Sequence, residues 1–111
     1  MGQAIREEFA GTSQTADPRV FVARQAIDAT TVGALRIELD EHLEAQGPEI
    51  GIDLAEVDFI DSTGLGLLVN LLRNARDRGG SVRLLNATRP VRRILQITGL
   101  EVIFEIPPGG E

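Results

Sequence analysis

Short apolar runs alternate with longer segments of helical periodicity along most of this 111-residue chain. The strand-like runs cover 19–23, 50–54, 81–85 and 102–106, and helical patterns at about 31–46, 62–78 and 88–98 lie between them. Such alternation is typical of a sheet covered by helices, with crossover connections between parallel neighbours. We therefore expect an α/β fold with a mixed sheet of four to five strands covered by three to four helices.

The length and the 42% hydrophobic content suit one domain with a single core. We expect residues 1–111 to form that domain, with its core over about 4–106 and a disordered tail at 107–111. Ile5 and Phe9 fall in a weakly patterned segment that could supply an edge strand.

Local signals mark where the helices begin and end. Thr30 or Thr31, Ser62 and Thr88 precede or open the three helical patterns, and Gly47, Gly79 and Gly99 follow them. Hydroxyl residues favour helix starts, and glycine favours the residue after a helix. The sequence therefore predicts helix boundaries close to these residues.

Charge is unevenly distributed along the chain. The net charge is −9 over residues 1–61, +6 over 62–100 and −3 over 101–111, and every basic residue is arginine. The arginines of the second half are Arg73, Arg76, Arg78, Arg83, Arg89, Arg92 and Arg93. They either neutralise acidic segments of the fold or form a face for an acidic partner. Nucleic acid does not fit, because the chain is net acidic and lacks Trp and Tyr.

Features of export and membrane insertion are missing from the sequence. There is no cysteine, no secretory signal pattern and no apolar run near the roughly 20 residues that span a bilayer. We expect a cytoplasmic protein without membrane insertion.

The segment Val57-Asp58-Phe59-Ile60-Asp61-Ser62-Thr63-Gly64-Leu65-Gly66 passes from an apolar run through an acid to two hydroxyls and a helix. Free N–H groups and the positive end of the helix dipole favour an anion at such a helix start. Ser62 is therefore a candidate phosphorylation site. The alternative is structural, because Ser, Thr and Asp are all preferred helix caps.

The helix that follows has an unusually wide apolar arc of roughly 200°. Leu67 and Leu71 lie at its margin, beside Asn74 and Arg78. They either form an exposed docking edge next to Ser62 or are covered by a neighbouring element.

An enzymatic function has little support. Nucleophilic catalysis by Ser62 needs a base, and the single histidine, His42, falls near the apolar stripe of the first helix. The carboxylates Asp28, Asp53, Asp58 and Asp61 could converge on Mg²⁺, although acids gather in the same way wherever they cap turns. We expect no catalytic residues, no metal and no cofactor.

The string Asp58 to Gly66, followed by Gly79-Gly80, Thr88-Arg89-Pro90-Val91 and Ile97-Thr98-Gly99-Leu100, resembles the STAS domain of bacterial anti-sigma factor antagonists. The resemblance covers about Val20 to Ile106. It implies a STAS-type fold and a partner-switching function in transcription and the stress response.

In that family the first hydroxyl residue after the Asp accepts the phosphate, which implies phosphorylation of Ser62. The unphosphorylated form binds an anti-sigma factor that is also a serine kinase with a histidine-kinase-like fold, and thereby frees the sigma factor. Phosphorylation ends the binding, and a PP2C-type phosphatase reverses it. The expected partner-binding residues are Asp28, Asp61, Ser62, Thr63, Gly64, Leu65, Gly66, Leu67 and Leu71.

One departure from the family pattern lies at Gln25-Ala26-Ile27-Asp28, which keeps the Asp but not the Gly-Glu that precedes it in the family. Two other functions suit the same fold: a module of a stressosome-like assembly, or an accessory subunit of a lipid or anion transporter. For the antagonist, we expect a monomer or a weak dimer.

Overall fold

A three-stranded parallel sheet forms the centre of the fold, in the order β1-β2-β3. The computed structural model describes residues 17–106. Its elements are β1 (Val20–Val22), α2 (Val32–Gln46), β2 (Glu49–Asp53), α3 (Ser62–Asp77), β3 (Ser81–Leu85), α4 (Arg89–Thr98) and the 3₁₀ helix η2 (Leu100–Val102).

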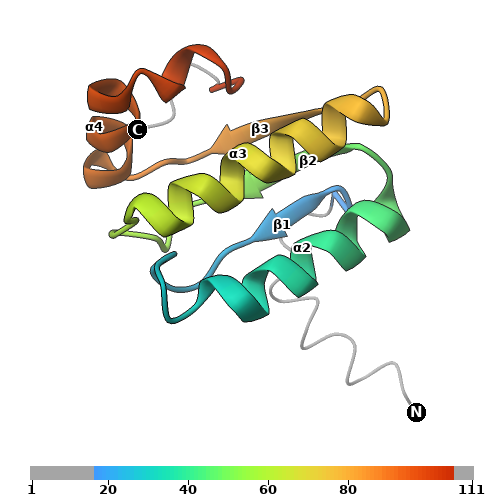
Figure 1. The fold of residues 1–111 in the computed structure, drawn as a ribbon, viewed down its shortest axis with the longest axis horizontal. Helices are drawn as coiled ribbons and strands as arrows, with labels where there is room; N and C mark the ends of the chain where they lie inside the picture. The colour runs from blue at the N-terminus through green and yellow to red at the C-terminus, as the bar shows by residue number, and fades with distance from the viewer. Residues whose placement is uncertain (1–16, 107–111) are drawn as a thin grey trace.

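Helices α2 and α3 connect the strands and lie side by side on the sheet (Figure 1). Parallel neighbours need such crossovers, because each strand must start at the same edge as the one before it. The strands are in register, with Val20 beside Gly51 and Ile50 beside Val82. Their carboxyl ends therefore share one edge of the sheet, and α2, α3 and α4 all begin beyond it.

The predicted helix ends are confirmed to within a residue or two. Gly47 and Gly99 follow α2 and α4 with φ of +96° and +80°, a conformation that costs other residues energy. Thr31 and Thr88 occupy the positions before α2 and α4, but their hydroxyls do not cap the helices. The Thr31 hydroxyl donates to the Ala26 carbonyl at 2.8 Å, and the Thr88 hydroxyl donates to Val57 at 2.6 Å.

The core lies between the sheet and the helices and is apolar throughout the described residues. Fully buried side chains come from β2, β3, α2, α3 and α4, and include Ile52, Leu84, Leu39, Leu68 and Leu95. All three helices therefore pack on the same core as the sheet.

One sequence prediction about the sheet is wrong, and a second is not confirmed. The expected strand at 102–106 is wrong, because Gly99 turns the chain into η2 and Glu105 makes a single parallel bridge to Arg83. The expected mixed sheet of four to five strands is not confirmed, since residues 17–106 hold three strands, all parallel. The expected edge strand at Ile5 and Phe9 and the tail at 107–111 lie outside the described residues.

Candidate functional site

The start of α3 is capped by Asp61 and not by Ser62. One carboxylate oxygen of Asp61, Oδ1, accepts a hydrogen bond from the Gly64 N–H at 2.9 Å. Ser62 is the first residue of the helix and is exposed. Because Asp61 performs the capping, the structural role that the sequence allowed for the Ser62 hydroxyl is not needed.

A second segment is joined to this helix start through backbone hydrogen bonds. Ile27 and Ile60 form a parallel bridge, in which the Ile27 N–H donates to the Phe59 carbonyl at 3.1 Å and the Asp61 N–H donates to the Ile27 carbonyl at 3.3 Å. The other Asp61 oxygen, Oδ2, accepts from the Ala29 N–H at 3.3 Å. A single carboxylate thus connects the 27–29 segment to α3.

Gly64 allows this close contact, whereas Gly66 has no such role. A Cβ atom on Gly64 would lie 2.2 Å from the carbonyl oxygen of Ile27, which is far inside van der Waals contact. From the sequence alone, both glycines are interpreted as positions where the helix packs closely against the sheet. For Gly64 the close packing is present, but it is made against the 27–29 segment and not against the sheet. For Gly66 the interpretation is wrong, since a Cβ there would meet nothing within 4 Å.

The Asp28 carboxylate organises the turn before α2. Its Oδ1 accepts from the Thr30 hydroxyl at 2.7 Å, from the Thr30 N–H at 2.9 Å and from the Thr31 N–H at 3.2 Å. These hydrogen bonds, with the Thr30 hydroxyl first, lower the pKa of Asp28 below its ordinary value of 3.8. Asp28 is therefore held ionised at neutral pH, in the segment that contacts Asp61.

Leu67 and Leu71 are not exposed, which corrects the prediction of a leucine docking edge. Their exposed fractions are 5% and 2%, and both belong to the core cluster. They border a small cleft between α3 and α2, which also contains Leu39 of α2. The wide apolar arc of α3 thus serves two neighbours, the sheet and α2.

The remaining expected partner-binding residues gather at the start of α3 and in the turn beside it. Asp28, Asp61 and Leu65 are half-buried, Ser62, Thr63 and Gly66 are exposed, and Gly64 is buried. The structure brings these seven residues to the same edge, through the Ile27–Ile60 bridge and the Asp61 carboxylate.

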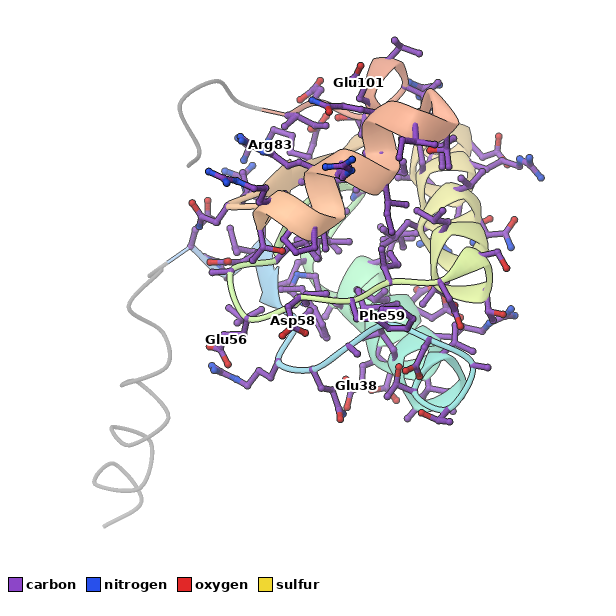
Figure 2. All side chains as sticks on the ribbon, turned by 90° about the vertical axis from the view of Figure 1, so that its left-hand side faces the viewer. Glu38, Glu56, Asp58, Phe59, Arg83 and Glu101 are labelled. Atoms are coloured by element: carbon purple, nitrogen blue, oxygen red, sulfur yellow. The ribbon has the colours of Figure 1, made fainter. Side chains whose placement is uncertain are left out.

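An exposed aromatic side chain at this end of the molecule was missed in the sequence. Phe59 is 50% exposed, although it stands in an apolar run between the buried Val57 and Ile60. Figure 2 shows Phe59 and Asp58 together at the end of the molecule where α3 begins, with Glu56 and Glu38 near them. The Glu56 carboxylate pairs with Arg24 at 2.9 Å. The segment that leads into α3 therefore exposes one acidic side chain, Asp58, and one aromatic side chain, Phe59.

His42 and the acidic residues were the sequence's candidates for chemistry, and the structure places them as follows. His42 packs edge-on against Phe21, with ring centroids 5.6 Å apart, and its Nε2 is buried without a hydrogen-bond partner. Within residues 17–106, no group of three His, Asp or Glu residues is placed to hold a metal ion. No helix in that range is long and apolar enough to cross a membrane.

Comparison with known proteins supports the resemblance to antagonists. The anti-sigma-B factor antagonist of Listeria monocytogenes is 37% identical over 87 residues, covering 78% of this chain and 75% of the relative. That of Bacillus subtilis is 36% identical over 95 residues, covering 86% of this chain and 85% of the relative.

Solved structures of the Bacillus anti-sigma factor antagonist SpoIIAA share the fold. The unphosphorylated form has a TM-score of 0.67 at 23% identity, covering 81% of this chain and 79% of SpoIIAA. The phosphorylated form has a TM-score of 0.61 at 22% identity, covering 81% and 82%. Residues 10–106 match the family model described as "Mlab, STAS domain". The chain therefore belongs to the STAS domain family.

Proposed function

We propose that this protein is an anti-sigma factor antagonist controlled by phosphorylation of Ser62. The unphosphorylated form binds an anti-sigma factor that is also a serine kinase, and so releases the sigma factor in the cytoplasm. Phosphorylation of Ser62 ends the binding, and a PP2C-type phosphatase restores it. The observation that carries this proposal is the exposed Ser62 hydroxyl beside an Asp61 that already caps the helix.

The local geometry supports a phosphate at Ser62 that leaves the fold intact. No described residue accepts a hydrogen bond from the N–H groups of Ser62 and Thr63 in the first turn of α3. The helix dipole favours a phosphate there by roughly 0.3–1 kcal/mol, while the nearby Asp61 and Asp58 oppose it. These opposing contributions are of similar size, so the free energy of unfolding should change little.

The proposed docking surface consists of Asp28, Asp61, Ser62, Thr63, Leu65 and Gly66, to which we add Phe59. Gly64, Leu67 and Leu71 are excluded because they are buried. In a complex on this surface, a phosphate on Ser62 loses its water. Burying a charge without a partner costs several kcal/mol, and each 1.4 kcal/mol is about tenfold in affinity. Phosphorylation therefore weakens the complex by orders of magnitude.

The named relatives support the antagonist over the other two functions. The Listeria and Bacillus proteins are anti-sigma-B factor antagonists, and they match most of the chain. SpoIIAA has been solved with and without phosphorylation. In this view the protein is a substrate of a kinase and not an enzyme, so incubation with ATP alone should give neither phosphorylated product nor hydrolysis.

The test uses the full chain and the anti-sigma factor of its own host. Ser62→Ala should bind the anti-sigma factor and resist phosphorylation, as measured by titration calorimetry and mass spectrometry. Ser62→Asp should keep its thermal stability and lose at least 100-fold in affinity, about 2.7 kcal/mol. Asn74→Asp adds the same charge at an exposed position farther along α3 and should bind normally.

The proposal fails if Ser62→Asp binds as tightly as the unmodified protein, or if Ser62→Ala accepts phosphate at the normal rate. Elution of the protein from its host in a large assembly with other proteins would favour the stressosome-like module instead. Copurification with a membrane protein would favour the transporter subunit.

A further inference from the structure

The exposed face of α4 is positively charged and ends in an apolar side chain. Arg89, Arg93 and Ile97 follow one another at intervals of four residues, so they form one stripe along the helix. All three are exposed, and Ile97 is 74% exposed. Among residues 17–106, the ion pairs found do not include Arg89 or Arg93. Val102, 80% exposed in the adjoining η2, extends the apolar end.

The exposed face of α2 has the opposite charge in the same spacing. Ile37 is 59% exposed, and the exposed Glu41 follows it by four residues on the same stripe. Glu38 is exposed next to Ile37, and the small Ala34 and Ala45 flank the stripe. Small residues let a second helix approach closely. The face thus combines one large apolar side chain with acidic groups and room for a partner.

The two faces match when the helices run antiparallel. Ile97 then lies opposite Ile37 and Arg93 opposite Glu41, because both pairs are separated by four residues, about 6 Å along a helix. We infer that α4 of one copy of this chain packs against α2 of a second copy. Both halves of the contact, with opposite charges and equal spacing, are carried by the same sequence.

The positions of the two helices decide the type of assembly. Helix α2 lies beside β1, and α4 lies on the opposite side of the molecule, past the end of β3 (Figures 1 and 2). Each copy therefore offers one complementary face to each of two neighbours. Such a contact is head-to-tail and gives chains that grow with concentration, whereas a closed two-fold dimer would stop at two copies.

This inference does not depend on the phosphorylation of Ser62, because it uses different helix faces. A contact of two helices is at the small end of protein interfaces, and its charged pairs are open to solvent. The association should therefore be weak and should decrease as salt is added.

Sedimentation velocity at low ionic strength, over a concentration series, tests the inference. The average mass of the unmodified protein should rise past that of a dimer. Arg93→Glu and Glu41→Arg each place like charges opposite one another, and each should reduce the association constant at least tenfold. Arg73→Glu makes the same charge change at an exposed position on α3 and should have no effect.

Mixing provides the sharpest comparison. An equimolar mixture of the Arg93→Glu and Glu41→Arg proteins should associate again, since every contact in it joins opposite charges. The double variant should do so by itself. The inference is overturned if the unmodified protein stays monomeric throughout, if Arg73→Glu acts like Arg93→Glu, or if the mixture stays monomeric. A mass that stops at the dimer overturns the head-to-tail arrangement.

Discussion

Two glycines in the first turns of α3 should respond in opposite directions to the same substitution. A Cβ on Gly64 would lie 2.2 Å from the Ile27 carbonyl oxygen and 2.9 Å from its carbon, while a Cβ on Gly66 would meet nothing within 4 Å. Backbone atoms cannot rotate away as a side chain end can. Gly64→Ala must therefore push α3 and the 27–29 segment apart, and Gly66→Ala displaces nothing.

The size of the destabilisation expected for Gly64→Ala follows from the contacts that would be strained or lost. Overpacking of this kind costs about 1–3 kcal/mol. Separation also stretches the Asp61 to Ile27 and Ala29 to Asp61 hydrogen bonds, both already 3.3 Å long and each worth about 0.5–1.5 kcal/mol. The greater helix propensity of alanine offsets about 1 kcal/mol of this loss in the free energy of unfolding. Gly64→Ala should thus lower the free energy of unfolding by about 1–5 kcal/mol, and Gly66→Ala should raise it by about 0.5–1 kcal/mol.

Urea unfolding followed by circular dichroism measures both variants against the unmodified protein. The unfolding midpoint should fall for Gly64→Ala and rise for Gly66→Ala, with unchanged slopes. If Gly64→Ala is as stable as the unmodified protein, the close approach of α3 to Ile27 is refuted. A loss of stability in Gly66→Ala would show that this glycine has a structural role that its open surroundings do not reveal.

Three further predictions concern Leu71, Asp61 and Asp28. Leu71→Ala should lower the free energy of unfolding by about 2–5 kcal/mol in urea titrations, while the protein that remains folded binds the anti-sigma factor normally, because Leu71 is a core residue. Asp61→Ala should cost about 0.5–2 kcal/mol by the same measurement, and Asp61→Asn, which retains a capping oxygen, should cost less. The lowered pKa of Asp28 means that its ionised form stabilises the fold above pH 3.8, and that this contribution is lost as the pH falls through the lower, folded pKa. The difference in unfolding free energy between the unmodified protein and Asp28→Asn, measured from pH 7 to pH 2, should therefore be constant near neutrality and disappear in acid; a difference that grows in acid would contradict this.

The helix boundaries could be predicted because their causes are local. Gly47 and Gly99 end helices through backbone conformations that depend on the residue itself, and the sequence displays both. Prediction from local sequence patterns failed where the structure of a segment depends on its pairing with a distant segment. The run at 102–106 has strand-like composition, yet β3 pairs with it at Glu105 alone.

For side chains at the site, too, local features could be predicted from the sequence and features that depend on distant segments could not. Leu67 and Leu71 were placed correctly on the margin of the apolar arc, but one helix alone does not reveal that α2 covers that margin. Phe59 was hidden by its apolar neighbours. Its carbonyl pairs with Ile27, more than thirty residues earlier, and its side chain is half exposed. No periodicity within the run indicates such a long-range bridge.

If Ser62 is phosphorylated as proposed, the bridge between Ile27 and Ile60 also limits what the kinase can recognise. The surface around Ser62 exists when two segments far apart in the sequence have been joined by folding, through Asp61 and the Ile27 carbonyl. A short peptide spanning Ser62 contains the hydroxyl but not the 27–29 segment. An enzyme that contacts both segments would therefore phosphorylate folded molecules and leave nascent or misfolded chains unmodified. The amount of phosphorylated protein would then report the amount of folded protein and not the total amount synthesised.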